Sequence, residues 1–370
     1  MNTGRSLQSL AAELERQAAS RKDYIAPQAN ITAVVEPGDT DVIRFAGFNG
    51  DAVPATPYAH GQLSDHLGIP KKYYDRMQVE QPALLAGNIN TWLQADPDNK
   101  RMIRTLDGRV RAVLSPKFRP LDNFDLAQTI LPDLIARNAQ VVSSELTETR
   151  LYIKAILPEL SDELPMGMAW GTGHNMVGGA GVDRGRVVSA IVISNSDIGA
   201  GTLRIEPSVF TTWCTNLAIM MKAAMKKYHV GRAHDADASW EVFRDETRVA
   251  DDKAFWLKVR DVARAAFDEK IFRAAVADMV LAAGNPIKHD DLSVVVDRTV
   301  IELALPPATG AGILKHLAAG GDLSQWGLSS AVTRVAGEVA DYELSTQLER
   351  AGGSILALPA ASWKSIAVAA

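Results

Sequence analysis

Near the end of its first third, the chain reads RTLDGRVRAVLSPKFRPLDN over residues 104–123. Asp107-Gly108 is a strong signal for a two-residue hairpin turn, because strand-forming residues flank it on both sides. With these two residues as the turn, Arg104 pairs with Arg111. Side-chain alternation then places both of them, and Arg109, on one face. The segment therefore predicts a β-hairpin with one cationic face and one apolar face.

The cations of this segment point to an anionic partner. Like charges side by side destabilise a fold unless an anion or a carboxylate neutralises them. A nucleic-acid backbone would do so, because the donor fork of a guanidinium matches the oxygens of a phosphate. Glutamates from elsewhere in the chain would also do so on a solvated sheet face, since surface ion pairs are common. Both interpretations stay open for Arg104, Arg109 and Arg111, and Lys117 and Arg119 follow them in the chain.

The composition is that of a folded globular protein, since 47% of the 370 residues are hydrophobic and 22% are charged. At about 150 residues per domain, this length allows two or three domains. The formal net charge of -5 argues against a protein that coats nucleic acid over its whole surface. Any site for a polyanion must therefore be a local basic patch.

The sequence predicts neither disulfide bonds nor membrane segments. The single cysteine, Cys214, excludes an internal disulfide and favours a reducing compartment. Residues 1–22 form a polar amphipathic run, so we expect neither a signal peptide nor a membrane anchor there. The sequence also lacks the long apolar run that a membrane-spanning helix needs. We therefore expect a cytoplasmic protein with no membrane partner.

Hydrophobic periodicity and turn residues predict an α+β fold. Strands are predicted around Asp107-Gly108 and within residues 31–46, 139–146, 150–157, 186–194 and 202–210. Helices are predicted over residues 5–20, 58–67, 71–77, 82–92, 122–138, 215–229, 252–268, 270–283, 297–304, 310–319 and 329–350. We expect three parts, namely an N-terminal helix (1–22), a mixed domain with antiparallel sheet (23–235) and an all-helical C-terminal region (236–370).

The helix predicted for residues 215–229 has a basic side. Lys222 and Lys226 are one turn apart with Lys227 beside them, and apolar residues cover the other side. The order of basic hairpin, helix, four strands and basic helix is similar to that of single-strand annealing protein cores, which is a fold-level analogy. The glycine-rich segment 171–185 lacks the phosphate-loop and dinucleotide-binding fingerprints, and its role stays open.

Several separated motifs resemble one known family. They are residues 58–74 (YAHGQLSDHLGIPKKYY), 104–123, 194–199 (SNSDIG), 214–216 (CTN), 325–333 (QWGLSSAVT) and 349–353 (ERAGG). From about Tyr24 onward, the chain resembles the phage- and plasmid-type family catalogued as domain of unknown function 932. The resemblance implies a mobile-element context and assigns no catalytic residue. The chain departs from the family pattern at Ser330, where an Asn is expected before the Ala, which puts a role for side chains there in doubt.

The leading prediction is a nucleic-acid-binding protein of a mobile element, with single-stranded DNA as the favoured partner. Annealing needs a cationic track and self-association, so that many weak sites act together, and we therefore also expect a homo-oligomer. Tyr73, Tyr74 or Trp213 could stack bases, although core packing is the more frequent use of such residues. The track would comprise Arg104, Arg109, Arg111, Lys117, Arg119, Lys222, Lys226 and Lys227.

Two other classes of function stay open. A metal-dependent nuclease or other phosphoryl-transfer enzyme would draw its ligands from His229, His234, Asp235, Asp237 and Glu206. That signal is weak, because two histidines at this spacing occur often by accident. Cys214 lacks an evident base that would make it a nucleophile. We therefore predict no metal site and no cofactor, leave catalysis open, and keep a non-catalytic structural or interaction protein as the third class.

Four polar residues near strand and helix ends are secondary candidates for a site. Backbone hydrogen-bond donors also collect at such ends, which is why polar ligands bind there. Turn and cap chemistry is the competing interpretation for each residue. The four candidates are Ser194, Asn195, Ser196 and Asn216.

Overall fold

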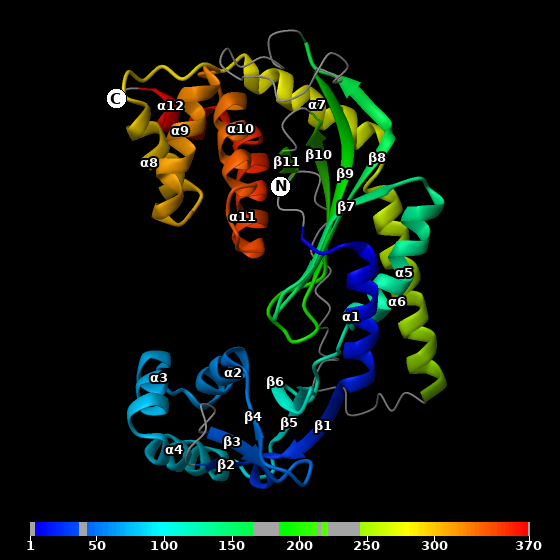
Figure 1. Ribbon diagram of the computed structural model, residues 1–370, viewed down its shortest axis with the longest axis vertical. Helices are drawn as coiled ribbons and strands as arrows, with labels where there is room; N and C mark the ends of the chain where they lie inside the picture. Colours follow the sequence, from blue (N-terminus) through cyan, green and yellow to red (C-terminus); the bar gives the residue numbers. More distant parts are fainter. Residues whose placement is uncertain (1–3, 37–42, 166–184, 213–215, 221–244, 369–370) are drawn as a thin grey trace.

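The computed structural model describes residues 4–36, 43–165, 185–212, 216–220 and 245–368. Within these ranges the chain has an α+β fold, with antiparallel sheets in the N-terminal part and only helices among the regular elements from residue 245 onward (Figure 1). This arrangement confirms the predicted fold class. In the part of the chain described, every helix is too short or too polar to cross a membrane.

Residues 22–114 form an N-terminal module at one end of the molecule (Figure 1). One of its sheets has the order β1-β5-β6, with β1 at Lys22–Pro27, β5 at Lys100–Leu106 and β6 at Arg109–Leu114. The other sheet has the order β2-β3-β4, with β2 at Thr32–Val35, β3 at Ile43–Ala46 and β4 at Val53–Pro54. An isolated bridge between Ala55 and Val110 joins the two sheets.

Three helices complete the N-terminal module: α2 (Pro57–Leu67), α3 (Lys71–Glu80) and α4 (Pro82–Ala95). The sequence signals at the ends of α2 act as expected. The hydroxyl of Thr56 accepts a hydrogen bond from the Ala59 N–H, and Gly68 ends the helix in the left-handed conformation with φ of 65°. Buried residues of these helices and of both sheets share one core, which includes Ile43, Tyr74 and Ile103.

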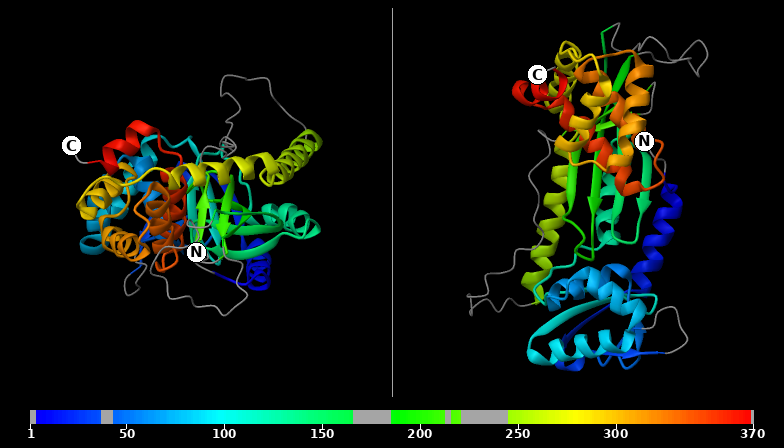
Figure 2. Two further views of the ribbon diagram at one scale, coloured as in Figure 1. Left: turned by 90° about the horizontal axis from the view of Figure 1, so that it is seen from above. Right: turned by 90° about the vertical axis from the view of Figure 1, so that its left-hand side faces the viewer.

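The centre of the molecule is a five-stranded antiparallel sheet with the order β11-β10-β9-β8-β7. Its strands are β7 (Gln140–Leu146), β8 (Leu151–Glu163), β9 (Arg186–Asn195), β10 (Arg204–Thr211) and β11 (Asn216–Ile219). Figure 2 shows this sheet between two groups of helices. The sheet therefore has two covered faces, which explains why nearly every residue of β9 is buried.

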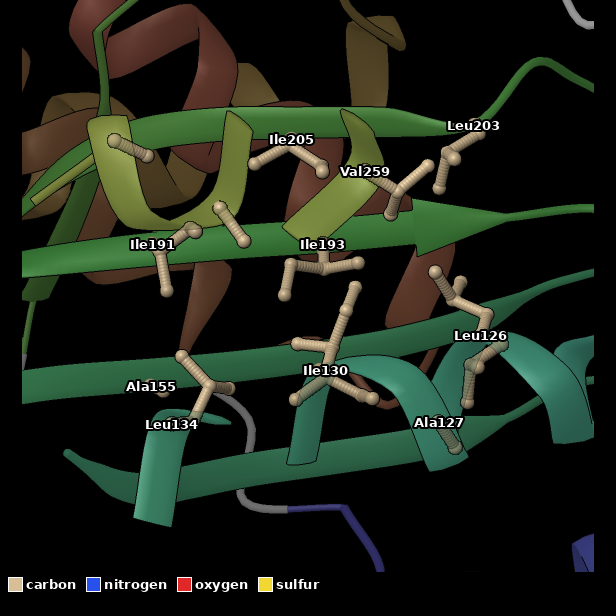
Figure 3. Packing of buried hydrophobic residues seen from close by; sticks show 14 of the residues in the cluster. Leu126, Ala127, Ile130, Leu134, Ala155, Ile191, Ile193, Leu203, Ile205 and Val259 are labelled. Carbon is tan, nitrogen blue, oxygen red and sulfur yellow. The ribbon is translucent and has the colours of Figure 1, made fainter. Parts of the chain in front are cut away.

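One face of this sheet is apolar. Helices α1 (Leu7–Ser20), α5 (Asn123–Ala136) and α6 (Asp245–Ala265) cover it. Figure 3 shows side chains of α5 and α6, such as Ile130 and Val259, meeting Ile193 of β9 and Ile205 of β10. Residues two apart along a strand share a face. The neighbours of these residues in β8 to β10 therefore point to the face opposite α5 and α6.

Helix α7 (Glu269–Ala283) packs on Val187 and Val209, which share the face of Ile193 and Ile205, so it covers the far end of the same apolar face. The opposite face meets α11 (Tyr342–Leu356). The other C-terminal helices are α8 (Leu292–Glu302), α9 (Gly310–Gly320), α10 (Gln325–Ala336) and α12 (Ala360–Ala367). Helices α8 to α12 share a core of their own, and α10 and α11 pack beside β11. We call α8 to α12 the C-terminal bundle.

The structure corrects four details of the sequence prediction. The strand register shifts between Arg104 and Thr105, so Arg104 pairs with Ala112, and the predicted pairing with Arg111 is wrong. Residues 216–219 form strand β11, where a helix was expected, which makes five strands in place of four. The single helix predicted for residues 329–350 is two helices, α10 and α11, and the helix predicted for 297–304 begins earlier, as α8 at Leu292.

Candidate nucleic-acid interface

Arg104 is a buried residue that carboxylates surround. Its side chain is 2% exposed, its Nε donates to Asp23 at 2.9 Å, and its Nη2 donates to Asp122 at 2.7 Å. Its Nη1 also donates to the main-chain carbonyl of Asp197. Burial opposes the charge of Arg104, but the carboxylates of Asp122 and Asp23 outweigh it and raise its pKa. Arg104 is thus a structural cation inside the protein.

Arg111 is the extra residue at the register shift, and it is buried as well. Its Nη2 donates to the main-chain carbonyl of Glu148 at 3.1 Å and lies 3.5 Å from Oδ1 of Asp197. A third cation, Arg21, lies 2.6 Å from Asp122. The expectation of one cationic face that presents Arg104 and Arg111 to a ligand is therefore wrong, because the fold has already supplied their partners.

We call these six residues the Arg–Asp cluster: Arg21, Arg104, Arg111, Asp23, Asp122 and Asp197. Its three guanidinium groups meet three carboxylates, so the cluster carries no surplus positive charge at neutral pH. A phosphate would gain no net Coulomb attraction there. The cluster instead joins the N-terminal module to the two hairpin turns, 147–150 and 196–203, at the near end of the five-stranded sheet.

The secondary candidates near the turn between β9 and β10 have packing roles. Asn195 is buried and its Nδ2 donates to the Leu121 carbonyl at 2.7 Å. The Ser196 hydroxyl accepts from the Ala200 N–H at 2.9 Å, which stabilises the turn. Ser194 is fully buried, 3.5 Å from Nη2 of Arg350. Asn216 begins β11, and its side chain lies outside the described residues.

Two ion pairs connect the sheet face opposite α5 and α6 to α11. Lys154 of β8 and Glu349 are both 0% exposed and their charged atoms lie 2.6 Å apart. Burial lowers the pKa of Lys154 and raises the pKa of Glu349, while their mutual attraction opposes both shifts. Arg350 donates three hydrogen bonds to the carboxylate of Glu206, at 2.7, 3.0 and 3.2 Å. These pairs hold the C-terminal bundle against the sheet.

The metal-site alternative receives no support from the described part of the chain. Of the five predicted metal ligands, only Glu206 lies in the described part of the chain, and its carboxylate binds Arg350. His229, His234, Asp235 and Asp237 lie outside the described residues, as does Cys214. Among the residues described, no group of three or more metal-ligating side chains occurs.

Several motif residues near the C-terminus also serve the fold. A Cβ on Gly353 would collide with the main chain of Ile219, so only glycine lets α11 approach β11 this closely. Gln325 connects α10 to the Ile355 carbonyl through its side-chain amide, at 2.6 Å. The Ser329 hydroxyl donates to the Gly352 carbonyl at 2.8 Å. These contacts give the motifs at 325–333 and 349–353 a packing role.

Three of the predicted cations remain at the surface. Lys117 is exposed and Arg109 is partly exposed. Arg119 is also partly exposed, and its guanidinium carbon lies 5.7 Å from the centre of the Phe255 ring. Lys222, Lys226 and Lys227 lie outside the described residues.

The aromatic neighbours of these cations were not predicted from the sequence. Phe255 and Trp256 on α6 pack against the apolar core of the sheet and stay partly exposed, and their ring centres lie 5.2 Å apart in an edge-to-face arrangement. Two adjacent aromatic residues between Lys253 and Lys258 were the available signal, but nothing local connects them with Arg119. We call Lys117, Arg119, Phe255 and Trp256 the α6 surface.

The tyrosines proposed to stack bases differ in their placement. Tyr74 is completely buried, and its hydroxyl lies 2.8 Å from Nδ1 of His60. Tyr73 is 49% exposed on α3. Trp213 lies outside the described residues. Tyr74 is therefore a core residue and unavailable to a base.

No family model matches the chain, and neither does any curated protein or solved structure. The motif resemblance and the analogy with annealing proteins therefore stay predictions.

Proposed function

We propose that the protein binds nucleic acid, with single-stranded DNA as the favoured partner, through the α6 surface. The observation that carries this proposal is the combination of exposed Lys117 with Arg119 over the Phe255 ring, beside Trp256. Proteins that bind single strands combine cations, which hold the backbone, with aromatic rings, on which bases stack. The lysines of residues 222–227 precede α6 in the chain and would extend the cationic track.

The α6 surface uses other cations than the hairpin face that the sequence predicts. Arg104 and Arg111 already have carboxylate partners, whereas Lys117 has none among the residues described. Phosphate contacts from a few exposed cations give modest affinity, so a chain with a net charge of -5 needs several copies on one strand to bind it tightly. Self-association is therefore part of the proposal.

Binding of fluorescent single-stranded and duplex DNA over a salt series tests this proposal. Lys117→Ala/Arg119→Ala should weaken binding and reduce the magnitude of the salt slope for single strands by about 1.4, because two phosphate contacts are lost. Lys288→Ala/Lys364→Ala is the matched control, since it removes two exposed lysines of the C-terminal part. Its salt slope should equal that of the wild type.

Three outcomes of this experiment would contradict the proposal. Equal slopes for both double variants would remove the α6 surface as the binding site. Absence of binding by the wild type would leave a structural or interaction protein. Degradation of the DNA on addition of Mg²⁺ or Mn²⁺ would instead indicate the phosphoryl-transfer enzyme.

A further inference from the structure

Helix α4 has an exposed apolar side. Leu84 is 49% exposed and Trp92 is 52% exposed, whereas Leu85 and Ile89 of the same helix are buried in the core of the N-terminal module. Tryptophan is enriched at the centre of interfaces relative to other surfaces. Residues at the spacing i, i+3, i+4, i+7, i+8 and i+11 share this side of the helix. We call them the α4 face: Leu84, Gly87, Asn88, Thr91, Trp92 and Ala95.

The α4 face carries no charged side chain. Among the α-helices of the described chain, α4 alone contains no Asp, Glu, Lys or Arg. The neighbouring helix α3 instead carries two surface ion pairs, Lys71 with Asp75 and Arg76 with Glu80. The solvent side of a surface helix usually carries charged residues, so an uncharged side with exposed Leu and Trp indicates a surface that another molecule covers.

The two polar residues of the α4 face bond to their own helix. Asn88 donates from Nδ2 to the Leu84 carbonyl at 3.0 Å, and the Thr91 hydroxyl donates to the Gly87 carbonyl at 2.7 Å. These donors are therefore used within the helix. The face offers a partner mainly apolar groups.

Gly87 has no packing role within the described part of the chain. A Cβ added to Gly87 would have no contact within 4 Å there beyond the backbone of its own helix. Gly353 differs, because a Cβ on it would collide with the main chain of Ile219. Glycine inside a helix destabilises it relative to alanine. A second helix that packs on Gly87 would offset this cost, because the missing side chain lets two helix axes approach closely.

We propose that the α4 face binds the α4 face of a second copy of this chain, with the two helices antiparallel. Asn88 lies at the centre of the face, because Leu84 precedes it by four residues and Trp92 follows it by four. With Asn88 at the twofold axis, Leu84 of each copy meets Trp92 of the other. Two copies bring identical charges together, so an uncharged face pairs with itself without repulsion. Helix α4 lies at the end of the N-terminal module away from the five-stranded sheet, where a second copy has room (Figure 1).

This pairing supplies the self-association that the proposed nucleic-acid binding requires, and its purpose rests on that proposed function. A dimer brings two α6 surfaces to one strand, so that two weak sites act together. Stable complexes bury about 1,200–2,000 Å² in total, which is more than one pair of short helices covers. We therefore expect an association that depends on protein concentration.

Sedimentation equilibrium of the full chain without nucleic acid tests the pairing, at concentrations from about 1 μM to 1 mM. The wild type should pass from monomer to dimer within this range. Leu84→Glu/Trp92→Glu should weaken association by about a hundredfold or more, because like charges meet at the interface. Leu281→Glu/Ile301→Glu is the matched control, since it adds the same charge at residues of α7 and α8 that are 68% and 78% exposed. It should associate as the wild type does.

Gly87→Ala separates the interface from a role within one chain. At low protein concentration, where the monomer prevails, its thermal midpoint should be higher than that of the wild type, because alanine favours the helix. Its self-association should nevertheless be weaker, because the added methyl group keeps the two helices apart. Association as strong as that of the wild type would contradict close packing at Gly87. This variant keeps the test valid if the double glutamate variant does not fold.

A cysteine at the twofold axis tests the antiparallel register. In a Cys214→Ser background, Asn88→Cys should form a disulfide between two copies on mild oxidation, because only residues near the axis approach their own counterparts. Val79→Cys, at a position of α3 that is 83% exposed, is the control and should form far less. Equal cross-linking of both variants would contradict the register.

The outcomes separate this inference from the proposed function. A wild type that stays monomeric over the whole range, or that associates no more tightly than Leu84→Glu/Trp92→Glu, would overturn the pairing. If such a protein still binds single-stranded DNA through the α6 surface, only the pairing fails. A dimer that binds no DNA would instead overturn the proposed function and leave the pairing in place.

Discussion

Arg104 combines three features that make it costly to replace: burial, two carboxylate partners and a main-chain acceptor. Removing one partner of a buried charge cluster leaves the others without compensation, which costs about 3–5 kcal/mol. Arg104→Met should therefore lower the free energy of unfolding by about that amount. Urea denaturation followed by circular dichroism measures this loss.

Replacement of Arg104 is uninformative about ligand binding unless folding is measured too. A variant that loses DNA binding only because it unfolds would imitate the loss of a phosphate contact. Per folded molecule, Arg104→Met should bind DNA as the wild type does, since Arg104 is inside the Arg–Asp cluster. A folded Arg104→Met protein with a reduced salt slope would contradict this interpretation.

Lys154 and Glu349 form a buried pair in which each charge depends on the other. Glu349→Leu alone should destabilise the protein by about 3–5 kcal/mol, because the charge of Lys154 loses its partner. Lys154→Met/Glu349→Leu should cost less than the sum of the two single changes, because apolar residues can replace a buried pair. A double-mutant cycle from urea denaturation measures the difference. Additive effects would show that the two residues do not interact in the folded protein.

At the residue scale, the sequence revealed local features better than distant partners. The Asp107-Gly108 turn could be predicted, and both residues adopt positive φ values of 51° and 71°. The partners of Arg104 could not, because Asp23 is 81 residues away and Asp122 is 18 residues away. The sequence of a segment with five cations is the same whether carboxylates of the chain or a bound ligand neutralise the charges.

The β5–β6 hairpin is held at its turn by helix α1. Arg16 of α1 donates to both carboxylate oxygens of Asp107, at 2.8 and 2.9 Å. Ser20 adds a hydrogen bond of 2.7 Å to the same carboxylate. The N-terminal helix thereby packs within its own chain and limits the movement of the hairpin.

Because of this contact, the stability of the folded protein depends on pH. Hydrogen bonds from Arg16 lower the pKa of Asp107 and lower the pKa of Glu13 to about 2. Carboxylates with a depressed pKa stabilise the folded state above their unfolded pKa of about 4, and this contribution is lost as the pH falls towards 2. Asp107→Asn, which tolerates the positive φ, should flatten the fall in stability between about pH 4 and pH 2.

Urea denaturation at several pH values measures how steeply the free energy of unfolding of Asp107→Asn falls with decreasing pH. Asp98→Asn is the control, because Asp98 is exposed and forms no ion pair among the described residues. Its slope should remain that of the wild type. A wild-type slope in Asp107→Asn would show that the contact with Arg16 contributes nothing in solution.

At the element scale, most predicted helices and strands were confirmed, and the errors have physical causes. Residues 216–219 resemble the start of an amphipathic helix, but pairing with β10 makes them a strand. The predicted helix over 329–350 is broken because Gly337 ends α10 and Asp341 caps α11, where its carboxylate accepts from the Glu343 and Leu344 N–H groups. Apolar periodicity continued across this break and concealed it.

The whole molecule depends on how the N-terminal module meets the sheet. Arg104 and Arg111 of the Arg–Asp cluster bind the two turns of the sheet, and the amide of Gln62 on α2 donates to the Ile198 carbonyl at 3.0 Å. These contacts are polar and few. Polar contacts at the ends of turns open more readily than the apolar core that α5 and α6 make with the sheet.

Arg111→Met should therefore loosen the junction without disturbing the centre of the sheet. It removes the hydrogen bond to the Glu148 carbonyl and leaves Asp197 without its guanidinium. Amide hydrogen exchange should accelerate in the turns 147–150 and 196–203, while protection in β8 and β9 should remain as in the wild type. Arg273→Met, in an exposed helical pair, is the control and should change neither region. Unchanged exchange in both turns would show that Arg111 does not hold the N-terminal module in place, whereas equal acceleration throughout would show that the junction and the sheet unfold as one unit.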